Sequence, residues 1–176
     1  MRTRLFKNLA EPVLTEPRPL ADPAAVAELA RAVDVGARKR LGRSLAIRQV
    51  DAGSCNGCEL EIHALNNPFY DIERFGIRFV ASPRHADVLL VTGPVTRNMR
   101  EALERTYQAT PHPKWVVAAG DCGLDGGIFA GSYACVGGVS EVLPVDLRIP
   151  GCPPTPEAIA EALLQLVDSR KTLAVS

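Results

Sequence analysis

The stretch "ADVLLVTGP", residues 86–94, is a largely apolar run that stops at a Gly-Pro pair. A short apolar run bounded by turn residues is typical of a β-strand that is buried on both faces of a parallel sheet. A second run of this kind, "KWVVAAGDC" (residues 114–122), also ends in a loop. The alternating segment "LAIRQVD" (residues 45–51) predicts a third strand, which leads into the loop "GSCNGC".

Helical patterns lie between these strands. Helices are expected over residues 58–67, after Thr96, and from Thr155–Pro156 onward. Because strands alternate with helices, the fold class is α/β with a mostly parallel sheet. An earlier short helix is expected to begin at Asp22–Pro23 and to end at Gly36. We therefore divide the chain into an N-terminal arm, short helix and basic patch (residues 1–43) and an α/β domain (residues 44–176).

Composition excludes several classes of protein. The chain has 176 residues, with 20 basic and 20 acidic side chains, so it lacks the positive charge that attracts nucleic acid. No apolar run approaches the length of a membrane span. The N-terminal residues are charged and include no apolar stretch typical of a secretory signal. We therefore expect a cytoplasmic protein with reduced thiols.

Four of the five cysteines follow predicted strands or precede the last helix. Cys55 and Cys58 lie in the loop after the first strand, Cys122 follows the strand "KWVVAAG", and Cys152 lies in a proline-flanked loop. The carboxyl ends of parallel strands meet at one edge of the sheet, where ligands bind in such folds. These four thiols are therefore expected to meet at that edge.

Four such thiols fit an iron–sulfur cluster, a zinc ion or redox chemistry. Zinc sites with four cysteines commonly use two short C-x-x-C pairs, whereas this chain has one pair and two single cysteines. A redox dithiol would use Cys55 and Cys58 alone. Glycines surround the thiols and allow backbone N–H groups to approach sulfur atoms, which favours a cluster. Cys135 is expected to be a small, buried apolar residue.

Three blocks of sequence resemble the small electron-transfer subunit that respiratory complex I (its 20 kDa subunit) shares with membrane-bound energy-converting [NiFe] hydrogenases. They are "RFGIRFVASPRHADVLLVTGPVTRNM" (residues 74–99), "GDCGLDGGIF" (residues 120–129) and "LPVDLRIPGCPPTPEAI" (residues 143–159). The resemblance implies a flavodoxin-like fold with helices on both faces of the sheet. It also implies one [4Fe–4S] cluster, with Cys55, Cys58, Cys122 and Cys152 as its ligands and no catalytic residue in this chain.

One difference separates the branches of this family. Complex I subunits carry two adjacent cysteines in the first ligand block, whereas this chain has Cys55-Asn56-Gly57-Cys58. That spacing resembles the hydrogenase branch, which includes formate hydrogenlyase. It implies a cluster that exchanges electrons with a large [NiFe]-hydrogenase-like subunit, or with a 49 kDa-like subunit if the complex I branch applies.

The resemblance also implies a ferredoxin-like iron–sulfur subunit and integral membrane subunits as partners, with no nucleic acid. The chain would then be peripheral, on the cytoplasmic side of the inner membrane. Three other readings stay open: a quinone-linked complex I-type subunit, a nickel-free hydrogenase-related complex, and a structural zinc protein. Glu59 and Glu61 are candidates for a proton relay, although a solvated first helical turn also explains them.

Overall fold

Five parallel strands form the central sheet in the order β2-β1-β3-β5-β7. The computed structural model describes residues 23–168, and the predicted extended arm over residues 1–21 lies outside them. The strands are β1 (Ala46–Asp51), β2 (Arg78–Phe79), β3 (Val88–Thr92), β5 (Trp115–Ala119) and β7 (Leu147–Ile149). Counted within this sheet alone, the order is 2-1-3-4-5, which is that of the flavodoxin-like fold. The predicted fold class is thus confirmed.

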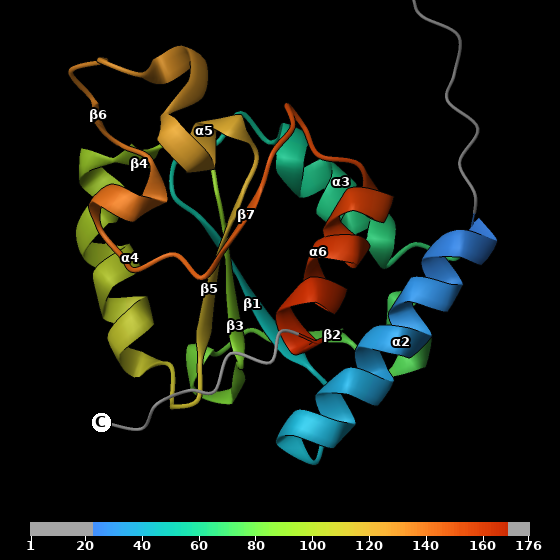
Figure 1. The fold of residues 1–176 in the computed structure, drawn as a ribbon. Coiled ribbons are helices and arrows are strands. Elements are labelled where there is room, and N and C mark those ends of the chain that lie inside the picture. The colour runs from blue at the N-terminus through green and yellow to red at the C-terminus, as the bar shows by residue number, and fades with distance from the viewer. Residues whose placement is uncertain (1–22, 169–176) are drawn as a thin grey trace, which may run out of the picture.

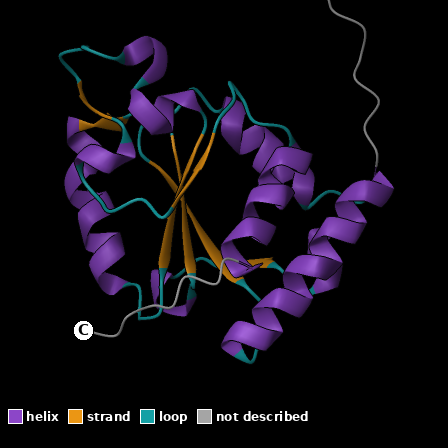
Figure 2. Cartoon of the chain, viewed as in Figure 1, coloured by secondary structure: helices purple, strands orange, loops and turns teal. Residues whose placement is uncertain are grey.

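Helices cover both faces of the sheet (Figures 1 and 2). One face carries α2 (Pro23–Leu41), α3 (Gly57–Leu65) and α6 (Pro156–Asp168), and the other carries α4 (Arg97–Ala109) and α5 (Asp121–Asp125). Single turns of 3-10 helix are η1 (Ile72–Phe75), η2 (Pro83–His85), η3 (Gly127–Phe129) and η4 (Val139–Glu141). A small antiparallel pair joins β4 (Val95–Thr96) to β6 (Cys135–Gly137).

The two central strands are buried along their whole length, as their apolar sequences predicted. Successive side chains point to opposite faces. Leu90 and Val117 pack in the cluster beneath α2, α3 and α6, whereas Leu89 and Val91 join the cluster on the α4 side. In α6, Ile159, Leu163 and Leu166 are buried in the first cluster, as the helical spacing predicted.

The first described helix is longer than expected. Gly36 was predicted to end it, but α2 continues to Leu41. Glycine inside a helix costs only about 1 kcal/mol relative to alanine. Burial of Ala37 in the core beneath α6 and the Arg38–Asp34 ion pair offset that cost. The helix ends instead before Gly42, whose positive φ of 71° suits a residue that follows a helix.

This longer helix places the basic patch "ARKRLGR" partly on the last turns of α2 rather than in a linker. The apolar residues Val26, Ala30 and Val33 of α2 pack in the same buried cluster as side chains of the central sheet. The division of the chain at Ser44 stays a prediction.

Within residues 23–168, no helix combines the length and apolar character needed to cross a membrane.

Candidate metal centre

The four predicted ligand cysteines lie on loops and helix ends beyond the carboxyl edge of the sheet, near α3 and α5 in the upper part of Figure 1. Cys55 is in the loop after β1, and Cys58 is in the first turn of α3. Cys122 is in the first turn of α5, directly after β5. Cys152 lies between β7 and α6. Cys55 and Cys152 are exposed, and the other two are partly buried.

Backbone hydrogen bonds hold these loops in place. The Oδ1 atom of Asp51 accepts hydrogen bonds from the N–H groups of Gly53 and Ser54, each at 2.8 Å, and so shapes the loop that leads to Cys55. Asp121 joins the other two loops. Its N–H donates to the Gly151 carbonyl at 2.9 Å, and its Oδ1 accepts from the Gly151 N–H at 2.8 Å. The residues that precede Cys122 and Cys152 are thereby bonded to each other.

The thiols are close enough to influence one another. Burial, and after it the neighbouring Glu59 carboxylate and the other three thiols, together raise the pKa of the Cys58 thiol to about 11. The pKa of Cys122 is also raised, first by burial and then by Cys152 and Cys55, although the Ile128 N–H group bonded to its sulfur opposes the change. Four thiolates here repel one another, so a bound cation would be needed to stabilise them together.

Glycines bring the backbone against two of these sulfur atoms. A Cβ atom at Gly120 would lie 2.5 Å from the Sγ atom of Cys58, and one at Gly127 would lie 2.9 Å from that of Cys122. Both glycines have positive φ angles, of 82° and 49°. The thiols therefore sit in a cradle that a side chain at either position would fill. Four soft sulfur donors in a glycine-lined cradle fit an iron–sulfur cluster.

Within residues 23–168, no three His, Cys, Asp or Glu side chains are arranged to hold one metal ion. The ligand set of Cys55, Cys58, Cys122 and Cys152 stays a prediction.

Cys135 lies apart from the other thiols in the small sheet. It is the first residue of β6 and pairs with Thr96 of β4. It is partly buried rather than fully buried, and it is not among the thiols that shift the pKa of Cys58 or Cys122.

Glu59 is more deeply buried than a solvated first helical turn allows. Its exposed fraction is 5%, and neither carboxylate oxygen has a hydrogen-bond partner among the described residues. Glu61 is only partly buried. A signal was present in the sequence, since Glu59 lies three residues before Ile62 and six before Leu65, the buried residues of α3. Helical spacing places these side chains on one face.

Large apolar side chains are exposed close to the cysteines in the sequence. Leu60, two residues after Cys58, is 62% exposed, and Ile128 in η3 is 85% exposed. Tyr133, in the segment between η3 and β6, is 91% exposed. The Arg97 side chain donates a hydrogen bond to the Tyr133 carbonyl at 2.6 Å and so ties this segment to α4. Neighbouring exposed apolar residues often mark a protein–protein contact.

Comparison with known proteins identifies the family. Residues 55–166 match the family described as NADH ubiquinone oxidoreductase, 20 Kd subunit. The match covers more than half of the chain and includes all four candidate ligand cysteines. The chain belongs to this family of oxidoreductase-complex subunits.

Two relatives are named as subunits of a formate hydrogenlyase and of a membrane-bound hydrogenase. The chain is 53% identical over 120 residues to formate hydrogenlyase subunit 7 of Escherichia coli K12, which covers 68% of this chain but only 47% of that protein. It is 48% identical over 126 residues to a probable membrane-bound hydrogenase subunit, mbhJ, of Pyrococcus furiosus, covering 72% and 75% of the two chains.

A solved structure of an archaeal respiratory membrane complex, the membrane-bound sulfane sulfur reductase, contains a similar chain. The TM-score is 0.63 at 39% identity, and the match covers 74% of this chain and 71% of that one.

Proposed function

We propose that this chain is an electron-transfer subunit that carries one [4Fe–4S] cluster in a membrane-attached [NiFe] hydrogenase of the formate hydrogenlyase type. The observation that supports the proposal is that Cys55, Cys58, Cys122 and Cys152 lie beyond one edge of the sheet, close enough for the other three to raise the pKa of Cys58. When bound, such a cluster supplies one-electron transfer.

The protein's own residues would hold and tune this centre. The four thiolates bind it, and the Asp121–Gly151 hydrogen bonds keep two of the ligand loops at a set separation. The Ile128 N–H group, which donates to the Cys122 sulfur, stabilises negative charge there. The buried Glu59 carboxylate acts in the opposite direction, because its charge disfavours added negative charge beside Cys58.

The large catalytic subunit would dock on the rim formed by Leu60, Ile128 and Tyr133, which we call the apolar rim. Leu60 follows Cys58 by two residues, and the Ile128 N–H group is bonded to the Cys122 sulfur, so a partner that contacts these two side chains would come close to the centre. A ferredoxin-like subunit and integral membrane subunits complete the proposed complex. Attachment would then be peripheral, on the cytoplasmic side of the membrane. The names of two relatives support membrane attachment, because they describe membrane-bound complexes.

A nickel-free relative is the second candidate function. The structural similarity to a sulfane sulfur reductase complex favours it specifically. The quinone-linked complex I reading is less well supported, because the Cys55-x-x-Cys58 spacing differs from the adjacent cysteines of that branch. The difference between these candidates lies in the large subunit, since the thiols at this site suit a cluster in each case.

The test is the nickel and iron content of the complex after anaerobic purification, combined with hydrogen-dependent viologen reduction on the same sample. Nickel together with activity supports the hydrogenase assignment. Iron without nickel or hydrogen activity overturns it in favour of a nickel-free or quinone-linked complex, while the cluster itself stands. Zinc without iron would overturn the electron-transfer role.

A further inference from the structure

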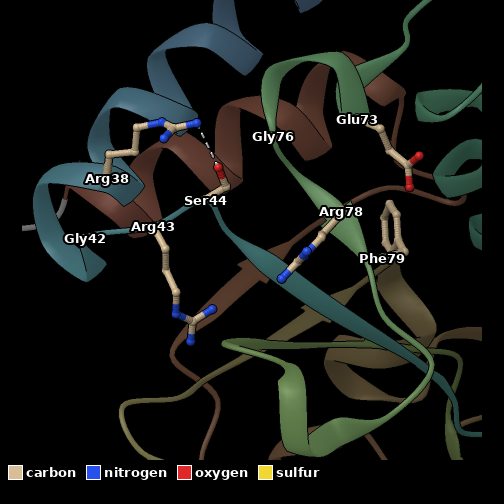
Figure 3. Close-up of a pocket in the computed structure, with 8 residues that line it drawn as sticks. All are labelled: Arg38, Gly42, Arg43, Ser44, Glu73, Gly76, Arg78 and Phe79. Atoms are coloured by element: carbon tan, nitrogen blue, oxygen red, sulfur yellow. Dashed lines mark hydrogen bonds between the residues drawn. The ribbon is translucent and has the colours of Figure 1, made fainter.

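A second site lies at the opposite end of the sheet from the cysteines. An open groove of about 670 Å³ lies between two segments: the end of α2 with the residues that follow it, and the residues that lead into β2 (Figure 3). Its lining residues are Arg38, Gly42, Arg43, Ser44, Glu73, Gly76, Arg78 and Phe79. We call it the arginine groove. It is formed at the amino ends of β1 and β2, whereas the thiols lie beyond the carboxyl ends.

Two of the three arginines are held in place by acidic side chains. The Arg38 Nε atom donates to Asp34 at 2.7 Å, and its Nη2 atom donates to the Ser44 hydroxyl at 3.2 Å. Ser44 in turn donates to Asp34 at 2.9 Å. These contacts use only part of the Arg38 guanidinium, and the side chain is 61% exposed. Its remaining N–H groups are free to bind an anionic group.

Arg43 is anchored in a similar way. Both of its Nη atoms donate to Asp87, at 2.9 and 2.5 Å, and the side chain is 52% exposed. Asp87 is almost fully buried and also accepts a hydrogen bond from the Ala46 N–H group at 3.0 Å. A buried carboxylate of this kind requires a paired cation. The Arg43 guanidinium is therefore held by Asp87 and lines the groove without being available to bind a further carboxylate.

Arg78 is different, because its side chain forms no hydrogen bond or ion pair with the described residues. It is exposed on β2, and its side chain extends over β1 toward Arg43 in Figure 3. A guanidinium presents five N–H donors in a planar fork that suits a carboxylate. Arg78 thus offers a complete carboxylate-binding group in the same groove as Arg38, and no described residue occupies it.

The backbone of β2 offers further donors and acceptors. β2 is an edge strand, and β1 is its only partner strand within residues 23–168. The N–H groups of Arg78 and Val80 donate to Leu45 and Ile47 of the β1 segment, at 3.1 and 2.8 Å. The intervening Phe79 backbone therefore faces away from β1, because alternate residues of a strand bond to opposite sides. An exposed strand edge is a template for an added extended segment.

We propose that the arginine groove binds an extended acidic segment of a partner subunit. The segment would lie along β2, with its backbone bonded to that of Phe79. The exposed Arg78 side chain would turn away from β1 to bind one of its carboxylates. This inference rests on the assembly with partner subunits proposed above and does not depend on the cluster.

Charge in the groove favours a peptide over a lipid surface. Glu73 lines the same groove, and Asp34 and Asp87 lie directly behind the arginines. A uniformly anionic membrane would meet these carboxylates as well as the arginines. A peptide avoids this repulsion by placing a neutral or basic residue beside Glu73. The concave shape and the free strand edge also suit an extended chain more than a flat layer of headgroups.

Zero-length cross-linking in the purified complex tests the contact. The Arg78→Lys variant keeps the charge and introduces an amine, which carbodiimide joins to a carboxylate in direct contact. We expect a cross-link to an Asp or Glu of another subunit. The matched control is Arg105→Lys on α4, where the native arginine pairs with Glu101, so that variant should cross-link only within its own chain.

Hydrogen exchange provides a second readout on the unmodified side chains. We expect the Phe79 amide to exchange at least tenfold more slowly in the complex than in the isolated full chain. The Arg78→Glu complex should lose this protection, whereas Arg105→Glu should retain it. The iron content of each complex, measured in parallel, should be unchanged, which separates failure of this inference from failure of the cluster assignment.

Three results would overturn the proposal. One is a cross-link from Arg78→Lys that reaches only Glu73 or no carboxylate at all. Another is equal exchange of the Phe79 amide in the complex and in the isolated chain. The third is Arg78-dependent binding of the isolated full chain to vesicles of phosphatidylglycerol and phosphatidylcholine, combined with no cross-link to a subunit, which would assign the groove to lipid.

Discussion

Replacing Gly120 with alanine should remove the cluster while leaving the fold largely intact. The new Cβ atom would lie 2.5 Å from the Cys58 Sγ atom, whereas ordinary van der Waals contact begins near 3.4 Å. The sulfur must therefore move by about 0.9 Å. Metal–ligand distances tolerate changes of only about 0.2 Å. Rotation of the Cys58 side chain relieves the clash cheaply, but it takes the sulfur out of the ligand position.

The cost to folding is expected to be moderate. Gly120 has a φ of 82° and a ψ of 154°, a conformation that is nearly confined to glycine, so alanine there costs about 1–3 kcal/mol. Gly131 is the matched control. It also has a positive φ, of 77°, but no atom lies within 4 Å of the position that a Cβ would occupy. Gly131→Ala should therefore add backbone strain without displacing a ligand.

The assay compares the two variants after anaerobic purification of the complex. Iron and acid-labile sulfide are measured per chain, and urea unfolding of the isolated chains gives the free energy of unfolding. We expect both variants to lose stability, and only Gly120→Ala to lose iron. Full iron content in Gly120→Ala, with an unchanged electron paramagnetic resonance spectrum, would refute the assignment of Cys58 to a ligand position beneath Gly120.

Three further predictions concern the thiols and the core. Cys152→Ser should lose the cluster and Cys135→Ser should retain it, as iron analysis would show; the reverse pattern would contradict the ligand assignment. Leu163→Ala should lower the free energy of unfolding by about 2–5 kcal/mol, because Leu163 is 1% exposed, whereas Leu60→Ala at an exposed site should change it little in urea titrations. In the metal-free chain, iodoacetamide should alkylate Cys58 more slowly than Cys55 at pH 8, because the Cys58 pKa of about 11 suppresses its thiolate; equal alkylation rates would count against the raised pKa. The folded chain should also lose stability as the pH rises from about 9 to 11, since the thiol ionises first in the unfolded chain.

The strands were predictable from local pattern, and the placement of the candidate ligands at one edge of the sheet followed from one topological rule. Continuous apolar runs identify β3 and β5 as buried strands. Parallel strands share a carboxyl edge, so residues that follow them in the sequence approach one another in space. That reasoning brought Cys55, Cys122 and Cys152 to one end of the molecule without any measured distance. The thiol environment in the structure agrees with this placement.

Features that depend on contacts between distant segments were not predictable. Gly36 predicted a helix end, but burial of Ala37 beneath α6, more than a hundred residues away in the chain, extends the helix to Leu41. The burial of Glu59 likewise depends on how α3 packs in the folded chain and not on its position in a first helical turn. At Gly36, burial of the helix contributes more free energy than the local preference of one residue.

The arginine groove illustrates the same division. The sequence alone predicts that the basic patch over residues 37–43 is either a solvated surface or a contact with an acidic partner or anionic lipid headgroups. Only the tertiary structure brings that patch beside β2 and pairs Arg38 and Arg43 with Asp34 and Asp87, while Arg78 has no partner among residues 23–168. Local sequence thus determined which segments become strands and where the thiols emerge, because those properties follow from periodicity. Side-chain burial and pairing were decided by packing, because they depend on which surfaces meet after the chain has folded.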